Sequence, residues 1–322
     1  MGVPLGRVGW ITGLLVFAFI GINRWAYVQV EAMTHFSTGG TKTAPPEKLS
    51  LAGKIKVLFT GVTFPRPENR QTPGDFQLSF RTFKYPSADT QILEAWSIFH
   101  PEPRCVVLMF AGYGASKASL LPEAKRLYDL GLDPFLTDFQ GTGGSDGDRT
   151  TLGFREAEDV AASFAFVPQI GPYKWRVLYG NSMGAVAVMK AVRDGPLKPD
   201  GLILECPFDS LLHTVENRFR LMGLPSFPAA ELLVFWGGVQ GGFNGFKHNP
   251  MDYAASLDCP VLYMSGEKDE RVTVEQSKAV FDRIPGTKRF VLFEGAGHQS
   301  YAALDGDKWG QSVQGFIQSL SD

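Results

Sequence analysis

Cysteine is scarce in this sequence, and its spacing argues against two kinds of site. The 322 residues include only Cys105, Cys206 and Cys259. These lie far apart and form no C-x-x-C pair or cysteine and histidine cluster, so the sequence indicates neither a zinc site nor a dense disulfide scaffold. Each lies in or beside an apolar run, where a small apolar side chain usually packs. We expect buried free thiols, with one disulfide as the alternative if the domain is exported.

An excess of charge of either sign is also lacking. The chain has 31 basic and 33 acidic residues and a formal net charge of -2, so no general field attracts nucleic acid. This balance favours a small-molecule or acyl substrate. Apolar residues make up 44% and charged residues 20% of the chain, which excludes a disordered or collagen-like protein.

One long uncharged run is present, at the N-terminus. It extends from Val8 to Ile22, between Arg7 and Arg24. Its 15 residues are fewer than the ~20 of a usual spanning helix and reach the upper limit for a signal peptide. Because no good cleavage site follows closely, we predict that residues 1–30 contain an uncleaved membrane anchor. Secretion after signal cleavage is the alternative, and a buried core helix is the third interpretation.

The orientation of this anchor depends on the charges beside it. Arg7 and Arg24 give little asymmetry. We prefer an anchor with its N-terminus inside and the rest of the chain outside the cytoplasm.

Residues 31–71 contain many turn-forming glycines and prolines and show no sustained period. We interpret them as a linker or an arm that wraps the domain, which we expect over 72–322. Its first two extended runs, 76–80 and 92–99, are separated by a turn. This arrangement is typical of an antiparallel strand pair.

From Cys105 onward, largely apolar runs alternate with helix-like segments. Strands that are covered on both faces and alternate with helices indicate a parallel sheet with right-handed crossovers. The last segment agrees, since Trp309, Val313 and Phe316 share one helical face. We predict an α/β fold with a mostly parallel, doubly wound sheet. The predicted strands cover residues 105–112, 133–139, 175–180, 202–206, 260–266 and 289–295.

One segment interrupts this alternation. More than fifty residues separate the predicted strands 202–206 and 260–266, about twice what one crossover needs. We predict an inserted helical cap at about 210–255. Its phenylalanine, leucine and tryptophan side chains would either line an apolar acyl site or simply pack the cap onto the sheet, and both interpretations stay open.

The strongest motif is GNSMG at residues 180–184. It closes the predicted strand 175–180 and leads directly into a helix-like stretch that ends at 195–196. A sharp turn from strand to helix brings backbone segments close together, so it needs glycine on either side of the serine, and it lifts the hydroxyl clear of the sheet. We predict that Ser182 is a nucleophile.

A serine hydroxyl is a weak nucleophile and needs a base within hydrogen-bond reach. His298 directly follows the strand 289–295, so it is expected on a loop at the carboxyl edge of the sheet, beside the serine turn. We predict His298 as the general base. The remaining histidines lie in the linker, after an early strand and in the predicted cap; they are His35, His100, His213 and His248.

A carboxylate must hold the imidazole in the correct tautomer and stabilise its positive charge. Asp269 follows the strand 260–266, and the order serine, acid, histidine along the chain is that of the G-x-S-x-G hydrolases. We predict Asp269 for this role. Glu267 and Glu270 are local alternatives, and Asp209 is a more distant one that would otherwise be a helix N-cap.

Amide donors must also face the oxyanion that forms during acyl transfer. The backbone N–H of Met183 is one candidate, because it belongs to the serine turn. The second is the backbone N–H of Tyr113, in the glycine-containing turn that follows the first central strand. An ordinary glycine turn is the alternative there.

These residues resemble the α/β-hydrolase superfamily, in particular its branches related to prolyl oligopeptidase and the serine aminopeptidases. The resemblance runs from about Phe76 to Leu320 and includes the serine turn, the loop at 138–145, the segment at 205–208, and the loops of Asp269 and His298. It implies hydrolysis of an ester, thioester or amide through an acyl-serine, without metal or organic cofactor. An esterase or lipase-like enzyme is the first hypothesis. A serine peptidase or aminopeptidase, and a non-catalytic binding protein with the same fold, are the alternatives.

Overall fold

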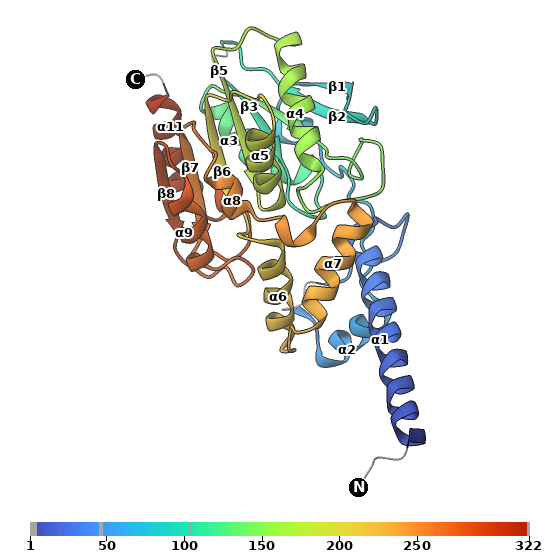
Figure 1. Cartoon of the computed structure of the whole chain (residues 1–322). Coiled ribbons are helices and arrows are strands. Elements are labelled where there is room, and N and C mark those ends of the chain that lie inside the picture. Colours follow the sequence, from blue (N-terminus) through green and yellow to red (C-terminus); the bar gives the residue numbers. More distant parts are fainter. Residues whose placement is uncertain (1–4, 45–47, 103–104, 321–322) are drawn as a thin grey trace.

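Eight strands form one sheet in the described part of the chain, which comprises residues 5–44, 48–102 and 105–320 of a computed structural model (Figure 1). The strand order is β1-β2-β4-β3-β5-β6-β7-β8. The pairs β1–β2 and β2–β4 are antiparallel, and all later pairs are parallel. The strands are β1 (Phe80–Pro86), β2 (Ile92–Ile98), β3 (Cys105–Phe110), β4 (Asp133–Thr137), β5 (Trp175–Asn181), β6 (Gly201–Glu205), β7 (Val261–Gly266) and β8 (Lys288–Phe293).

Helices cover both faces of the sheet, so the central strands are buried on both sides. In β3, Val106 and Leu108 face one core, whereas Val107 and Met109 face the other. This alternation explains why the strand is apolar throughout. One core contains α4 (Glu156–Phe166), α5 (Met183–Asp194), α8 (Pro250–Ala254) and α9 (Val274–Arg283), and the other contains α3 (Leu121–Asp129), α10 (Tyr301–Leu304) and α11 (Gly306–Ser319).

The predicted α/β fold with a doubly wound, mostly parallel sheet is confirmed. An antiparallel pair does open the sheet, but the predicted first run, 76–80, shares only Phe80 with its first strand. The first strand begins later than its apolar pattern suggested. Pro73–Phe76 forms a short 3-10 helix with a capping box at Thr72, so β1 starts only at Phe80. Because proline is favoured in the first turn of a helix, local turn chemistry overrides the alternating pattern here.

Between β6 and β7, α6 (Leu211–Met222) and α7 (Ala229–Gly241) form a separate layer that we call the cap. The cap packs on the N-terminal helix, α1 (Leu5–Thr34), through a small apolar cluster that includes Ala26, Val30 and Leu233. The segment between α1 and the domain contains a further helix, α2 (Leu51–Thr60), which the sequence pattern did not indicate. In Figure 1, α1 extends away from the rest of the molecule, with α2 beside it.

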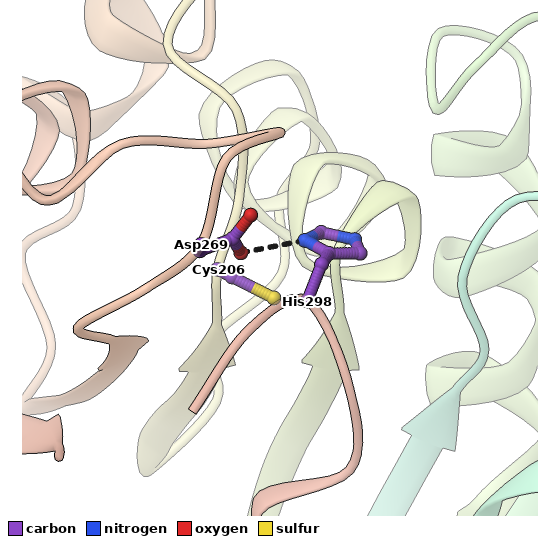
Figure 2. A group of neighbouring side chains, drawn as sticks. All are labelled: Cys206, Asp269 and His298. Carbon is purple, nitrogen blue, oxygen red and sulfur yellow. Dashed lines mark hydrogen bonds and ion pairs between the residues drawn. The ribbon is translucent and has the colours of Figure 1, made fainter. Parts of the chain in front are cut away.

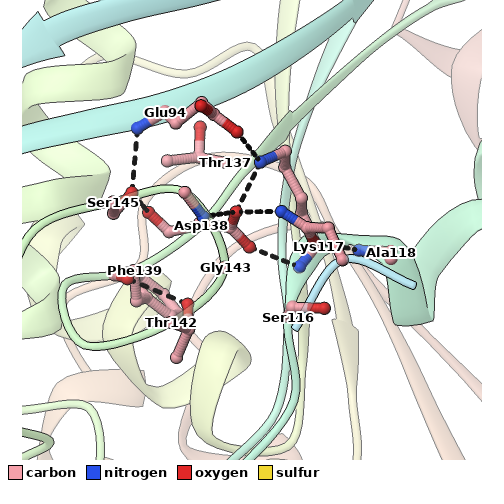
Figure 3. Close-up of polar contacts among 12 residues, drawn as sticks. Glu94, Ser116, Lys117, Ala118, Thr137, Asp138, Phe139, Thr142, Gly143 and Ser145 are labelled. Atoms are coloured by element: carbon pink, nitrogen blue, oxygen red, sulfur yellow. Dashed lines mark hydrogen bonds and ion pairs between the residues drawn. The ribbon is translucent and has the colours of Figure 1, made fainter. Parts of the chain in front are cut away.

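A buried ion cluster joins β2 to the loops that follow β3 and β4 (Figure 3). The ammonium of Lys117 has no exposed surface, pairs with Asp138 and lies 2.9 Å from Glu94. Asp138 also accepts hydrogen bonds from the side chain of Asn69, at 2.7 Å, and from the backbone N–H of Lys117, at 2.7 Å. Because buried charges are stable only when paired and hydrogen-bonded, this cluster holds the turn after β3 in one position.

Replacing Lys117 should therefore be far more costly than replacing an exposed lysine. Lys117→Met leaves the carboxylate of Asp138 buried without a cation, whereas Glu94 keeps Lys84 at 3.6 Å, and we expect the free energy of unfolding to fall by about 3–5 kcal/mol. The control is Lys125→Met, which removes an exposed pair with Asp129 and should cost about 0.5 kcal/mol or less. Urea unfolding measures both, and equal losses would contradict the structural role of the cluster.

Candidate active site

Ser182 occupies a tight turn between β5 and α5. Its backbone angles, φ 51° and ψ -113°, are unusual for a residue with a side chain, and its N–H donates to the carbonyl of Glu205 at 2.7 Å. A Cβ atom at Gly180 would collide with the backbone of Ala185, and one at Gly184 with the carbonyl of Phe110. The two glycines of the motif are therefore required by close backbone contacts on either side of the serine.

Three side chains from different loops form a hydrogen-bonded series at the carboxyl edge of the sheet. The imidazole Nε2 of His298 lies 3.0 Å from the Oγ of Ser182, and its Nδ1 lies 2.7 Å from the Oδ2 of Asp269. Figure 2 shows the Asp269 carboxylate pointing at the ring. The three residues follow β5, β7 and β8, so parallel pairing brings them to one edge.

The environment of Asp269 keeps its carboxylate ionised. Its side chain is fully buried, and burial alone would raise its pKa. The hydrogen bond and the charge of His298 act in the opposite direction, as do backbone N–H donors at Arg271 (2.8 Å) and Val272 (3.0 Å). The net effect lowers the pKa of Asp269, so its negative charge is available to the imidazole at neutral pH.

Two of the alternative acids, Glu267 and Asp209, have other partners. Glu267 accepts the backbone N–H of Gly295 at 2.8 Å. Asp209 lies 2.5 Å from the imidazole of His213, on the cap. It is also not the N-cap of α6, a position taken by Ser210, whose hydroxyl accepts the N–H of His213.

Among the five histidines, which all lie in the described ranges, only His298 has a hydrogen bond with Ser182. His248 is instead fully buried under the cap, with its ring nitrogens 2.8 Å from the hydroxyl of Tyr253 and 3.0 Å from the carbonyl of Leu152. Burial lowers the pKa of His248 to about 4, so its ring is neutral at physiological pH. This histidine joins the cap to the domain rather than serving the serine.

The thiol of Cys206 lies beside this series, as Figure 2 shows. Its sulfur and one ligand atom each of Asp269 and His298 lie within 4.8 Å of one another, a spacing that invites comparison with a metal site. Both imidazole nitrogens already have partners, however, and burial followed by the charge of Asp269 raises the pKa of Cys206 well above its ordinary value. Because both ring nitrogens of His298 are engaged, the geometry favours the hydrogen-bonded series over a metal site.

The turn after β3 packs directly against the serine turn. A Cβ atom added at Gly112 would lie 3.5 Å from the Cβ of Ser182. The side chain of the next residue, Tyr113, donates to the carbonyl of Met33 at 2.6 Å, and the ammonium of Lys42 donates to the carbonyl of Gly114 at 2.8 Å. The C-terminal end of α1 and the segment after it therefore hold this turn from outside, through contacts that no local sequence pattern indicates.

A cavity of about 280 Å³ lies between the end of α1, the loop before α4 and the cap. Thr34, Leu152, Leu211 and Phe243 are among the residues that line it, and Ser182 is not. Thr150, also in its wall, has its hydroxyl 3.4 Å from the sulfur of Met183. The cavity is therefore a space next to the serine turn and under the cap, rather than the reaction centre itself.

Comparison with known proteins agrees with the fold. The family model described as serine aminopeptidase, S33, matches residues 101–227. The uncharacterized protein YqkD of Bacillus subtilis is 22% identical over 76% of this chain and 82% of its own length. Protein bem46 of Schizosaccharomyces pombe is 25% identical over 78% of this chain and 82% of its own length.

A solved structure, that of the esterase Pf2001 of Pyrococcus furiosus, has the same architecture. It superimposes with a TM-score of 0.69 at 21% identity and covers 87% of this chain and 99% of its own. The sheet, its covering helices and the serine turn are those of the α/β-hydrolase fold. The chain is similar to esterase-like and peptidase-like members of the α/β-hydrolase superfamily, in sequence over residues 101–227 and in fold over most of its length.

The buried histidine gives a prediction for acid stability. Because the folded pKa of His248 lies near 4 and its ordinary value is 6.5, the unfolded chain binds more protons between these pH values. Its contribution is therefore complete above about pH 6.5 and is lost as the pH falls toward 4, a loss of about 2 kcal/mol between pH 7 and pH 5. In urea unfolding of the full chain in detergent, His248→Gln should remove that part of the pH dependence. The control His213→Gln should retain it, and equal pH dependence in the two variants would refute the assignment.

Proposed function

We propose that the chain is a serine hydrolase that cleaves a carboxylic ester through an acyl-serine intermediate. The observation that carries the proposal is the hydrogen-bonded series of Ser182, His298 and Asp269. In this proposal, Nε2 of His298 takes the hydroxyl proton as the oxygen of Ser182 attacks the ester carbonyl, and then gives it to the leaving alcohol. The ionised Asp269 stabilises the imidazolium that forms between these steps.

Hydrolysis of the acyl-serine repeats the same proton transfers with water. His298 activates the water, which attacks the acyl carbonyl and releases the acid and the free serine. In both halves the negative oxygen would be stabilised by the backbone N–H groups of Met183 and Tyr113. The close packing of Gly112 on Ser182 supports this role for the turn after β3.

The cavity beside the site has a mixed lining, in which Phe243 and Leu211 lie with charged side chains such as Arg155 and Glu156. Phe243 lines the cavity under the cap and stacks on Phe154 with ring centroids 4.1 Å apart. Other apolar residues of the cap have different surroundings, since Phe219 is buried against α1 and α7, whereas Phe235 is half exposed. Leu211 of the cap and Phe243, in the segment after α7, therefore face the cavity, whereas Phe219 packs the cap on α1.

We also propose that α1 anchors the chain in a membrane. Its residues Thr12–Thr34 are long and apolar enough to span one. A relative from Saccharomyces cerevisiae, 24% identical over 73% of this chain, is described as the uncharacterized membrane protein YNL320W. An orientation with the hydrolase domain outside the cytoplasm stays a prediction, and protease protection in sealed vesicles measures it.

A fluorophosphonate probe tests the catalytic proposal, because it reacts with activated serine hydroxyls. We expect the full chain to label, Ser182→Ala not to label, and His298→Ala to lower kcat for a short p-nitrophenyl ester by at least ~10³. The matched control, His213→Ala, removes a histidine of the cap and should retain activity. Failure of the wild type to label would instead favour a non-catalytic binding protein.

A peptidase is the second candidate, because the matching family model is that of a serine aminopeptidase. Hydrolysis of short p-nitrophenyl esters should be compared with that of aminoacyl and peptidyl anilides, each with Ser182→Ala as the blank. We expect the esters to be cleaved with the higher kcat/KM. Anilide cleavage that equals or exceeds ester cleavage, and that requires a free amino group, would reverse the order of the two candidates.

A further inference from the structure

Helix α2 presents an apolar face to the outside of the molecule. Leu51, Ile55 and Phe59 are 75%, 51% and 77% exposed. Their spacing of four residues places them on one stripe of the helix. None of the ten residues of α2, which all lie within the described ranges, is buried. A surface helix of a globular domain normally turns such a stripe inward, and an outward apolar stripe marks a site of interaction.

This face lies at the end of the molecule from which α1 extends (Figure 1). The carbonyls of Val57 and Leu58 accept hydrogen bonds from Gln29, and that of Leu58 also accepts one from Trp25 at 2.7 Å. On its other side, Lys54 donates to the carbonyls at the end of α6, both at 3.1 Å. The loop 223–228 begins there, and its Phe227 is 76% exposed.

The free part of α1 has the length of a bilayer core. One face of its C-terminal half packs on α7, with Ala26 and Val30 buried, whereas Tyr27 and Val28 on the other face are 44% and 50% exposed. Side chains before this half, including Leu14, Phe17 and Ile20, are exposed. From Leu5 to Ile22, a stretch that shares residues 12–22 with the apolar span Thr12–Thr34, the helix rises about 26 Å, close to the ~30 Å of hydrocarbon in a bilayer. The membrane surface would then lie near Ile22, on the same side of the molecule as α2.

The charges on α2 also suit a lipid surface. The helix contains Lys54 and Lys56 and no acidic residue, and the exposed Arg24 is on the adjoining turn of α1. Both lysines flank the apolar stripe, but the ammonium of Lys54 is bonded to the end of α6, so the exposed Lys56 is the one that reaches lipid phosphates while the stripe enters the apolar layer. Apolar burial and attraction to anionic headgroups therefore act together on this face.

We propose that α2 and the loop 223–228 form a second membrane contact, which seats the domain on the bilayer surface beside α1. This inference rests on the proposed anchoring by α1, but not on the proposed catalytic activity. It has a consequence for the site, because α1 reaches the turn after β3 through the bond from Tyr113 to Met33. Met33 is about 16 Å beyond Ile22 along the helix, so the serine turn would lie a short, defined distance above the lipid.

Nitroxide labels on the full chain in phosphatidylcholine and phosphatidylglycerol vesicles test the proposal. They are introduced by Phe59→Cys and Phe227→Cys, in a Cys259→Ser background because the other two cysteines are buried. Power-saturation EPR compares collisions with oxygen, which concentrates in lipid, and with the water-soluble complex NiEDDA. At both positions we expect oxygen accessibility to exceed NiEDDA accessibility.

Two further labels calibrate the result. Phe17→Cys, on the free part of α1, should give the lipid pattern, and Leu304→Cys, which is 48% exposed on α10, should give the water pattern. A water pattern at 59 and 227 would overturn the proposal, and low access to both reagents would overturn it in favour of a protein partner or second copy. A water pattern at 17 would refute anchoring as well. Fluorophosphonate labelling of the same samples reports the catalytic proposal separately.

Discussion

The parallel pairing of β5, β6, β7 and β8 is the constraint on which the rest of the site depends. Asn181 pairs with Glu205, Glu205 with Met264, and Gly266 with Phe293, so these strands end at nearly one level. The loops that follow carry Ser182, Cys206, Asp269 and His298. A hydrogen bond tolerates only a few tenths of an ångström. The sheet is covered on both faces by close-packed side chains, which keep the ends of its strands in fixed positions. The loops that carry the site are therefore held at hydrogen-bonding distances.

The turn after β3 is held by buried ion pairs on one side and by hydrogen bonds with the N-terminal segment on the other. On the inner side, the buried pairs of Lys117 with Asp138 and Glu94 resist displacement, since any shift would leave a charge without a partner. On the outer side, Met33 and Lys42 contact Tyr113 and Gly114 through single hydrogen bonds. The proposed anchor and the proposed oxyanion turn are therefore parts of one packed unit, and the position of the membrane would be transmitted to the site through α1.

The sequence predicted the features that depend on local patterns. Apolar runs predicted the six central strands to within two residues at each end, and the glycine spacing around Ser182 predicted the turn between β5 and α5. Patterns failed where distant contacts decide the structure. Helix α2 has no inward apolar face and depends on α1 and α6 for its contacts, so its periodicity indicated no packed helix. Helix α1 continues to Thr34, beyond the uncharged run, because the cap packs on its second half.

Residue type and chain order by themselves determined which side chains were candidates for the site. A strand that is buried on both faces needs an apolar run, and the serine turn needs glycine at fixed positions. Both requirements are local, so both can be recognised in the sequence. The tertiary structure decided the rest. It brought the imidazole of His298 within 3.0 Å of Ser182 and paired Asp209 with His213 instead. It also placed the end of α1 against the turn of Tyr113. These choices depend on distances between segments far apart in the chain, which are set by the packing of the whole fold and not by any stretch of sequence.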